Sequence, residues 1–174
     1  TGKQEVPYEE LLEAYKEQIT AQIEAGADLL VAETMLGETE PMAVLDAAAS
    51  ICDLPVMCTL TVESDGSLFF GGNVYDAAKA LADMGADAVG INCSTGPDQL
   101  MAVTENLRKA VDIPLIVKPN AGMPVIDDQG NPVYSMEARE FAINMKRLIG
   151  VGVDIAGGCC GTTPEYIREL KGIL

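Results

Sequence analysis

The sequence predicts an α/β fold with a parallel sheet, and three observations support this class. Amphipathic helical segments alternate with short apolar strands along the 174 residues. A unit of helix end, Gly, Ala or Val, Asp and apolar strand recurs as AGADLLVAE, MGADAVGIN and VGVDIAGG. Uninterrupted apolar strands joined by helices are typical of parallel sheets that are covered on both faces. The polar, Gly-rich and Cys-rich segments follow the strands, where doubly wound sheets and (β/α) barrels both place active sites.

The elements of the first half follow from these patterns. A helix is expected over residues 8–25, because apolar side chains recur at helical spacing and Gly26 follows as a typical C-terminal residue. A second helix is expected over residues 40–51, with Pro41 in its first turn, and a third over residues 74–84. Strands are expected over residues 27–33, 54–62 and 86–93, and residues 64–72 are expected to form a loop or a hairpin-like excursion.

The second half continues the alternation. Helices are expected over residues 98–111 and 136–149, and strands over residues 113–120 and 153–158. The segment AGMPVIDDQGNPVYS, residues 121–135, is expected to be a long loop. A last helix begins at Thr163, which is a possible N-cap residue, with Pro164 at the first helical position. No GxGxxG motif follows a strand and no Walker loop is present, which disfavours nucleotide binding.

Composition excludes several classes of partner. Eleven basic and 27 acidic residues give a net charge of −16, which argues against nucleic acids and anionic membrane surfaces. No apolar run approaches the roughly 20 residues of a membrane span, and the first residues lack a secretory signal. Five cysteines cannot all pair within one chain. We therefore expect one domain over residues 1–174, with free thiols or a metal site, in the cytoplasm.

Three of the thiols sit where two predicted strands end. Cys93 closes GINC, and Cys159 and Cys160 lie within GGCCGT, in a chain without histidine. Three thiolates and one open position suit a catalytic zinc ion, and a thiol substrate bound there would lose its proton. Adjacent cysteines can bind one ion only if the backbone turns sharply, which the flanking glycines permit. A redox dithiol at Cys159 and Cys160 is the weaker alternative, because no CxxC motif occurs.

Four motifs carry a resemblance to a known family. They are AETM (residues 32–35), GINCSTGP (90–97), KPNAGMP (118–124) and GGCCGTTPEYI (157–167). In this order and spacing they resemble the zinc-dependent homocysteine S-methyltransferases, most closely the homocysteine domain of cobalamin-dependent methionine synthase. The resemblance implies a partial (β/α)8 TIM barrel of about five β/α units, corresponding to strands 4–8. A full barrel takes about 250 residues, so we expect a domain truncated at its N-terminal side.

The resemblance also implies roles for individual residues. Cys93, Cys159 and Cys160 match the zinc ligands, and Asn120 is expected to fill the fourth position when no substrate is bound. Turn formation is an equal alternative for Asn120. Glu33 is expected to bind the amino group of homocysteine, and its alternative role is a structural partner for a nearby lysine or a helix N-terminus. Lys118 is expected to be structural.

The implied chemistry is zinc-dependent transfer of a methyl group to the homocysteine thiol, which gives methionine. Zinc lowers the thiol pKa and orients the sulfur for attack. Methylcobalamin carried by a separate corrinoid module is the favoured donor, and S-methylmethionine is an alternative. A non-catalytic reading stays open, because five β/α units leave two sheet edges unpaired. In that reading the chain is an inactive fragment, or it pairs with a complementing N-terminal chain or with itself.

Overall fold

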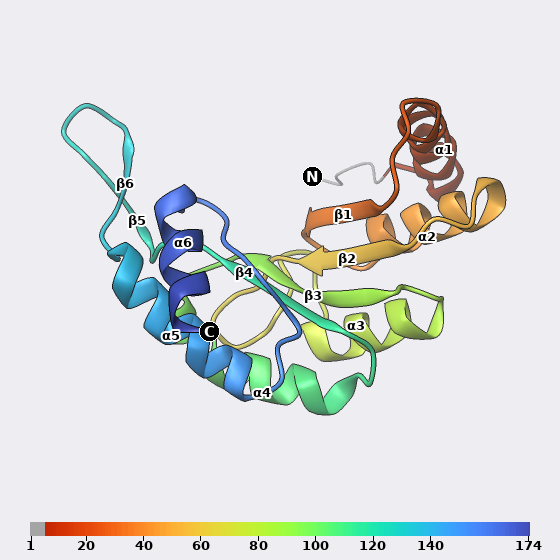
Figure 1. Cartoon of the computed structure of the whole chain (residues 1–174). Helices are drawn as coiled ribbons and strands as arrows, with labels where there is room; N and C mark the ends of the chain where they lie inside the picture. Colours follow the sequence, from red (N-terminus) through yellow and green to blue (C-terminus); the bar gives the residue numbers. More distant parts are fainter. Residues whose placement is uncertain (1–5) are drawn as a thin grey trace.

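Five parallel strands form one curved sheet in the structure, a computed structural model that describes residues 6–174 (Figure 1). In sheet order the strands are β1 (Leu30–Met35), β2 (Val56–Leu60), β3 (Ala88–Cys93), β4 (Leu115–Pro119) and β7 (Ile155–Ala156). The helices are α1 (Tyr8–Glu24), α2 (Thr39–Ile51), α3 (Val74–Asp83), α4 (Met101–Ala110), α5 (Ala138–Gly150) and α6 (Pro164–Ile173), and the 3-10 turn η1 (Pro97–Gln99) precedes α4. No helix of this part of the chain has the length and apolar character needed to cross a bilayer.

The strand order decides between the two predicted architectures. Successive strands of the sheet are neighbours in space, and all four pairings are parallel. A doubly wound sheet would reverse its order at a switch point, and this sheet has none. The helices form an arc around the outer side of the curved sheet (Figure 1). This arrangement is the wall of a (β/α) barrel, built from consecutive β/α units.

Alternate strand residues divide the sheet into two faces. The side chains that face the helices form the hydrophobic core; among them are Leu60, Val89, Ile91, Leu115 and Val117, each fully buried. On β1 the intervening residues face the inner side, where Val31 is 47% exposed. The expectation of a sheet covered on both faces is therefore wrong for the β1 edge, because nothing within residues 6–174 covers that inner face.

Cys58 belongs to this core and lies apart from the other thiols. Its side chain is fully buried, and burial raises the pKa of the thiol to about 12. The thiol is thus kept protonated and unreactive, and the residue serves as a small buried hydrophobe.

The recurring aspartate has a defined structural task. The Asp87 carboxylate accepts the N–H of Val56, the first residue of β2, at 2.8 Å. Asp154 does the same for Leu115, the first residue of β4, at 2.9 Å. Each aspartate lies just before one strand and accepts the first N–H of the strand that comes before it in the sheet order. The third copy, Asp28, has no such partner within residues 6–174.

Two segments differ from the expectation. The predicted loop at residues 121–135 contains an antiparallel hairpin of β5 (Pro124–Ile126) and β6 (Pro132–Tyr134). The Asp127 carboxylate closes its turn by accepting the N–H groups of Gln129 and Asn131 at 2.9 and 2.8 Å.

The first strand begins at Leu30 rather than at residue 27. At the last helix, the Thr163 hydroxyl accepts the N–H of Glu165 at 3.3 Å, which confirms the predicted N-cap.

Candidate metal centre

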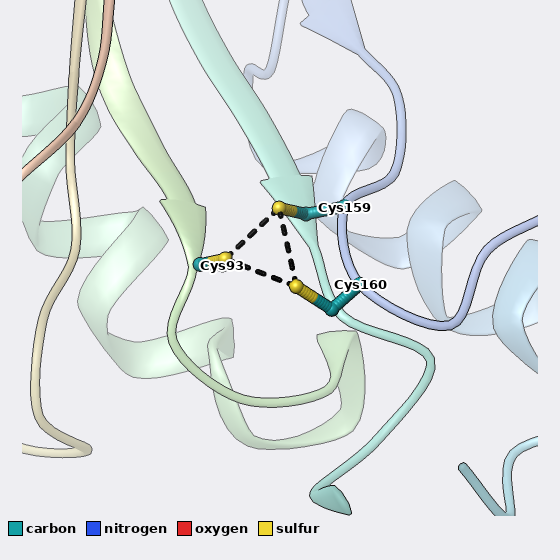
Figure 2. A group of neighbouring side chains, drawn as sticks. All are labelled: Cys93, Cys159 and Cys160. Carbon is teal, nitrogen blue, oxygen red and sulfur yellow. Dashed lines mark hydrogen bonds between the residues drawn. The ribbon is translucent and has the colours of Figure 1, made fainter. Parts of the chain in front are cut away.

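Three thiols converge at the carboxyl edge of the sheet (Figure 2). The sulfur of Cys93 lies 2.9 Å from that of Cys159 and 3.6 Å from that of Cys160, and the last two are 3.9 Å apart. A tetrahedral zinc ion with Zn–S bonds of about 2.3 Å spaces its sulfur ligands about 3.8 Å apart. The separations that involve Cys160 match this value. The Cys93–Cys159 separation is shorter, but it is well above the length of a disulfide bond, about 2.0 Å.

A left-handed backbone turn aims the first thiol. Cys93 and Ser94 have φ values of 55° and 64°, a region that costs side-chain-bearing residues energy. Ser94 is held in this turn, because its hydroxyl accepts the N–H of Val62 at 2.9 Å and its own N–H donates to Thr61 Oγ1 at 3.2 Å. The turn ends the strand alternation and lets the Cys93 thiol reach the loop after β7.

Asn92 connects the centre to β1. Its Oδ1 accepts the Thr34 N–H at 2.9 Å, and its Nδ2 donates to Thr34 Oγ1 at 2.7 Å and to the sulfur of Cys159 at 3.7 Å. Thr34 is itself left-handed, with φ of 62°. Asn92 thus has the contacts of a residue that orients a metal ligand.

Asn120 joins the two loops that carry the thiols. Its Oδ1 accepts the N–H of Cys160 at 3.0 Å, and its Nδ2 donates to the carbonyl of Ser94 at 3.4 Å. The residue is only 6% exposed. A carbonyl oxygen has two lone pairs, so the bond from Cys160 leaves one for a further partner.

The three thiols perturb one another. Burial raises the pKa of Cys93 to about 12, and its hydrogen bonds to Cys159 and Cys160 add to this effect. Burial also acts to raise the pKa of Cys159, but hydrogen bonds from Cys93 and Asn92 outweigh it, so this pKa lies below its usual range. One thiolate is therefore stabilised by its neighbours, and full deprotonation of the triad calls for a cation.

Glu33 reaches the same edge from β1, where it forms an ion pair with Lys118 of β4. The side chains are 49% and 23% exposed. The sequence left this structural partnership open as an alternative to substrate binding. The contact spans the inner side of the sheet across β2 and β3.

Tyr134 has contacts at the centre that the sequence did not suggest. It ends β6, and its ring lies over Gly161, the residue that follows Cys160. An aromatic residue between a proline-containing strand and a helix carries no distinctive signal, and only the folded hairpin brings it to the thiols.

The model of the family described as "Homocysteine S-methyltransferase" matches residues 1–174. The chain belongs to the homocysteine S-methyltransferase family. This confirms the predicted family. A methionine synthase of Mycobacterium leprae is 34% identical over 169 residues, which cover 94% of this chain and 14% of the relative. The Mycobacterium tuberculosis methionine synthase is 33% identical over the same shares.

Solved structures support the same assignment. The homocysteine methyltransferase MmuM of Escherichia coli superposes with a TM-score of 0.78 in its apo form and 0.81 in its metallated form, at 26% identity in both. These matches cover 97% and 99% of this chain, but 58% and 54% of MmuM. The family member described here thus spans little more than half of MmuM. About five units of a TIM barrel are confirmed as the fold.

Proposed function

We propose that this chain provides the zinc-binding part of a homocysteine methyltransferase, which transfers a methyl group to the homocysteine thiol and forms methionine. The convergence of Cys93, Cys159 and Cys160 carries the proposal. Three soft sulfur donors without histidine or carboxylate favour zinc over harder divalent ions. Membership of the family and the existence of a metallated form of MmuM support this choice.

Zinc bound by the three thiolates would lower the pKa of a thiol substrate at its open position. The chain's own residues shape that position. Asn92 orients Cys159, while Asn120 fixes the backbone of Cys160 and has a lone pair for the fourth position before substrate arrives. No basic side chain is required, because the substrate proton leaves to solvent as the sulfur binds.

Glu33 is the proposed partner of the homocysteine amino group. One carboxylate oxygen engages Lys118, which fixes the side chain on the inner side of the sheet. The other oxygen remains for an ammonium group. An ion pair and a substrate contact thus share one carboxylate, so the two roles left open for Glu33 are compatible.

Methylcobalamin on a separate corrinoid module is the proposed donor, and S-methylmethionine is the alternative. The likeness to two methionine synthases supports the first. Because free thiols at the centre need a reducing compartment, we place this chemistry in the cytoplasm.

The metal content of protein purified under reducing conditions tests the proposal. We expect about one zinc ion per chain and a proton released when homocysteine binds. Cys93→Ser should lose the zinc, and Cys52→Ser, which removes a thiol outside the triad, should keep it. Absence of zinc from the unaltered reduced chain would refute the proposal.

A second candidate function, assembly with further β/α units, is favoured by the sheet edges. Within residues 6–174, β1 and β7 each have a neighbouring strand on one side only. A groove of about 290 Å³ lies beside β1 and one of about 300 Å³ beside β7. The first is lined by Ile19, Leu30 and Val31, and the second by Ala156, Ile167 and Leu170. Parallel strands inserted there would cover both grooves.

Asp28 gives this candidate a register. Asp87 and Asp154 each hold the first N–H of the preceding strand, and Asp28 occupies the same place before β1. The β1 edge is thus suited to a parallel strand whose first N–H meets Asp28. Light scattering tests the idea: we expect self-association, or binding of an N-terminal β/α half added as a separate polypeptide. A chain that stays monomeric and does not bind this N-terminal half would count against the assembly function.

A further inference from the structure

The strand β1 contains a bulge on the side of the candidate metal centre. Two of its residues, Glu33 and Thr34, lie opposite the single residue Thr59 of β2. Regular alternation would turn the residue after Glu33 toward the helices. The extra residue instead returns Met35 to the hydrophobic core and leaves Glu33 and Thr34 both exposed. Bulges of this kind redirect side chains, and they are frequent beside active sites.

One side chain of β3 holds this bulge in place. Thr34 has a left-handed backbone with φ of 62°, a conformation that is costly for a β-branched residue. The Asn92 side chain accepts the N–H of Thr34 at 2.9 Å and donates to its hydroxyl oxygen at 2.7 Å. Asn92 is only 1% exposed, so water does not compete for its amide. Backbone and side chain of Thr34 are thus fixed by the same group.

The same amide also contacts the thiols. Besides its bond to Thr34, Asn92 Nδ2 donates to the sulfur of Cys159 at 3.7 Å. Glu33 directly precedes Thr34, and its carboxylate pairs with Lys118, the residue of β4 that lies beside Asn92 in the sheet register. A short path of hydrogen bonds therefore leads from the residue after Glu33 to one of the three candidate metal ligands.

We propose that Thr34 is a positioning residue, which sets the separation between the Glu33 carboxylate and the metal centre and so selects thiol amino acids by their chain length. The inference rests on the proposed function, in which Glu33 binds the amino group and zinc binds the sulfur of one substrate. Homocysteine has one methylene more than cysteine between these two groups. A fixed separation discriminates between the two amino acids, whereas a loose bulge would accept both.

The variant Thr34→Val tests this role, because it keeps a β-branched side chain and removes the hydroxyl. Calorimetry on zinc-loaded protein measures the affinities for homocysteine, cysteine and γ-mercaptobutyrate, which lacks only the amino group of homocysteine. We expect the preference for homocysteine over each of the others to fall about threefold or more. The affinity for γ-mercaptobutyrate should not change, because its binding does not use Glu33. Thr34→Ser, which retains the hydroxyl, should keep the preference, and Thr20→Val, at an exposed position of α1, should change no affinity.

The Glu33→Gln background separates positioning from direct contact with the substrate. Thr34→Val should cause no further fall in preference there, because both substitutions act through one carboxylate. A further fall would make Thr34 itself a substrate contact and overturn the positioning role. Equal weakening of all three thiols in Thr34→Val would indicate a general loosening of the centre and overturn it as well, and so would unchanged preferences. An unaltered chain that binds no zinc, or that binds homocysteine and γ-mercaptobutyrate equally, would instead refute the proposed function or its assignment of Glu33, and the role of Thr34 with it.

Discussion

Replacing the three repeated aspartates by alanine, one at a time, tests how the sheet is held in register. Asp87 and Asp154 accept strand N–H groups at 2.8 and 2.9 Å, and Asp154 also pairs with Arg108 at 3.0 Å. Asp28 has no partner within residues 6–174. Each substitution removes one negative charge from a net charge of −16, so the change in self-repulsion is matched across the three.

The structure sets the expected magnitudes. A hydrogen bond to a charged group contributes roughly 1.5–3 kcal/mol, and solvent screening of these exposed carboxylates reduces the contribution to about 1 kcal/mol. We expect Asp87→Ala to lower the free energy of unfolding by about 1 kcal/mol. Asp154→Ala should cost about 2 kcal/mol, because the ion pair is lost as well. Asp28→Ala should cost nothing beyond the shared charge effect.

Urea unfolding of the reduced chains, followed by circular dichroism, gives the three values at one pH. If Asp28→Ala destabilises the chain as much as Asp87→Ala does, the cost does not come from a strand N–H, and the register argument for the β1 edge fails with it. An Asp87→Ala chain of unchanged stability would refute the structural role of the repeat.

Three further predictions concern single positions. In Gly90→Ala the new Cβ would lie 1.8 Å from the Ile116 carbonyl oxygen, so β3 and β4 must separate. We expect urea unfolding to show a free energy of unfolding lower by about 3 kcal/mol or more. Gly150→Ala is the control, because its new Cβ would have no atom within 4 Å. Asn120→Ala removes the acceptor of the Cys160 N–H and should weaken zinc binding about tenfold in chelator competition; unchanged affinity would leave Asn120 only a turn residue. Glu33→Gln should weaken homocysteine binding about tenfold by calorimetry at unchanged zinc content, and equal affinity would assign Glu33 to Lys118 alone.

The general fold could be predicted because its signals are local. Apolar periodicity and the Gly–Asp repeat located the helices to within a few residues, and five strands in order implied a parallel sheet. Strand ends were placed less well: the predicted strand over residues 54–62 is Val56–Leu60 in the structure, because apolar residues continue past the paired ones. The β5–β6 hairpin was missed, since two strands of three residues that both begin with proline lack an alternating pattern.

The thiols could be placed together because parallel strands end at the same edge, and cysteine is visible in a sequence. The contacts that orient them could not. The left-handed backbone conformation of Thr34, Cys93 and Ser94 is rare for residues of these types, so the sequence does not predict it. The Glu33–Lys118 pair depends on the curvature of the sheet across two intervening strands, which no local pattern encodes.

The two-residue strand β7 has a consequence for the order of folding. Its strand register with β4 comprises only Ile155 and Ala156, although the N–H groups of Gly157 and Cys159 also donate to β4 carbonyls, and the loop after it supplies two of the three thiols. Cys93 and Cys159 are 66 positions apart, and an ion that ties them closes a chain loop whose entropy is worth about 4 kcal/mol by the relation used for cross-links. We therefore expect metal capture and docking of the C-terminal unit to be coupled. A chelator should act first as a local denaturant, with amide hydrogen exchange rising from β7 to α6 before the rest of the sheet responds.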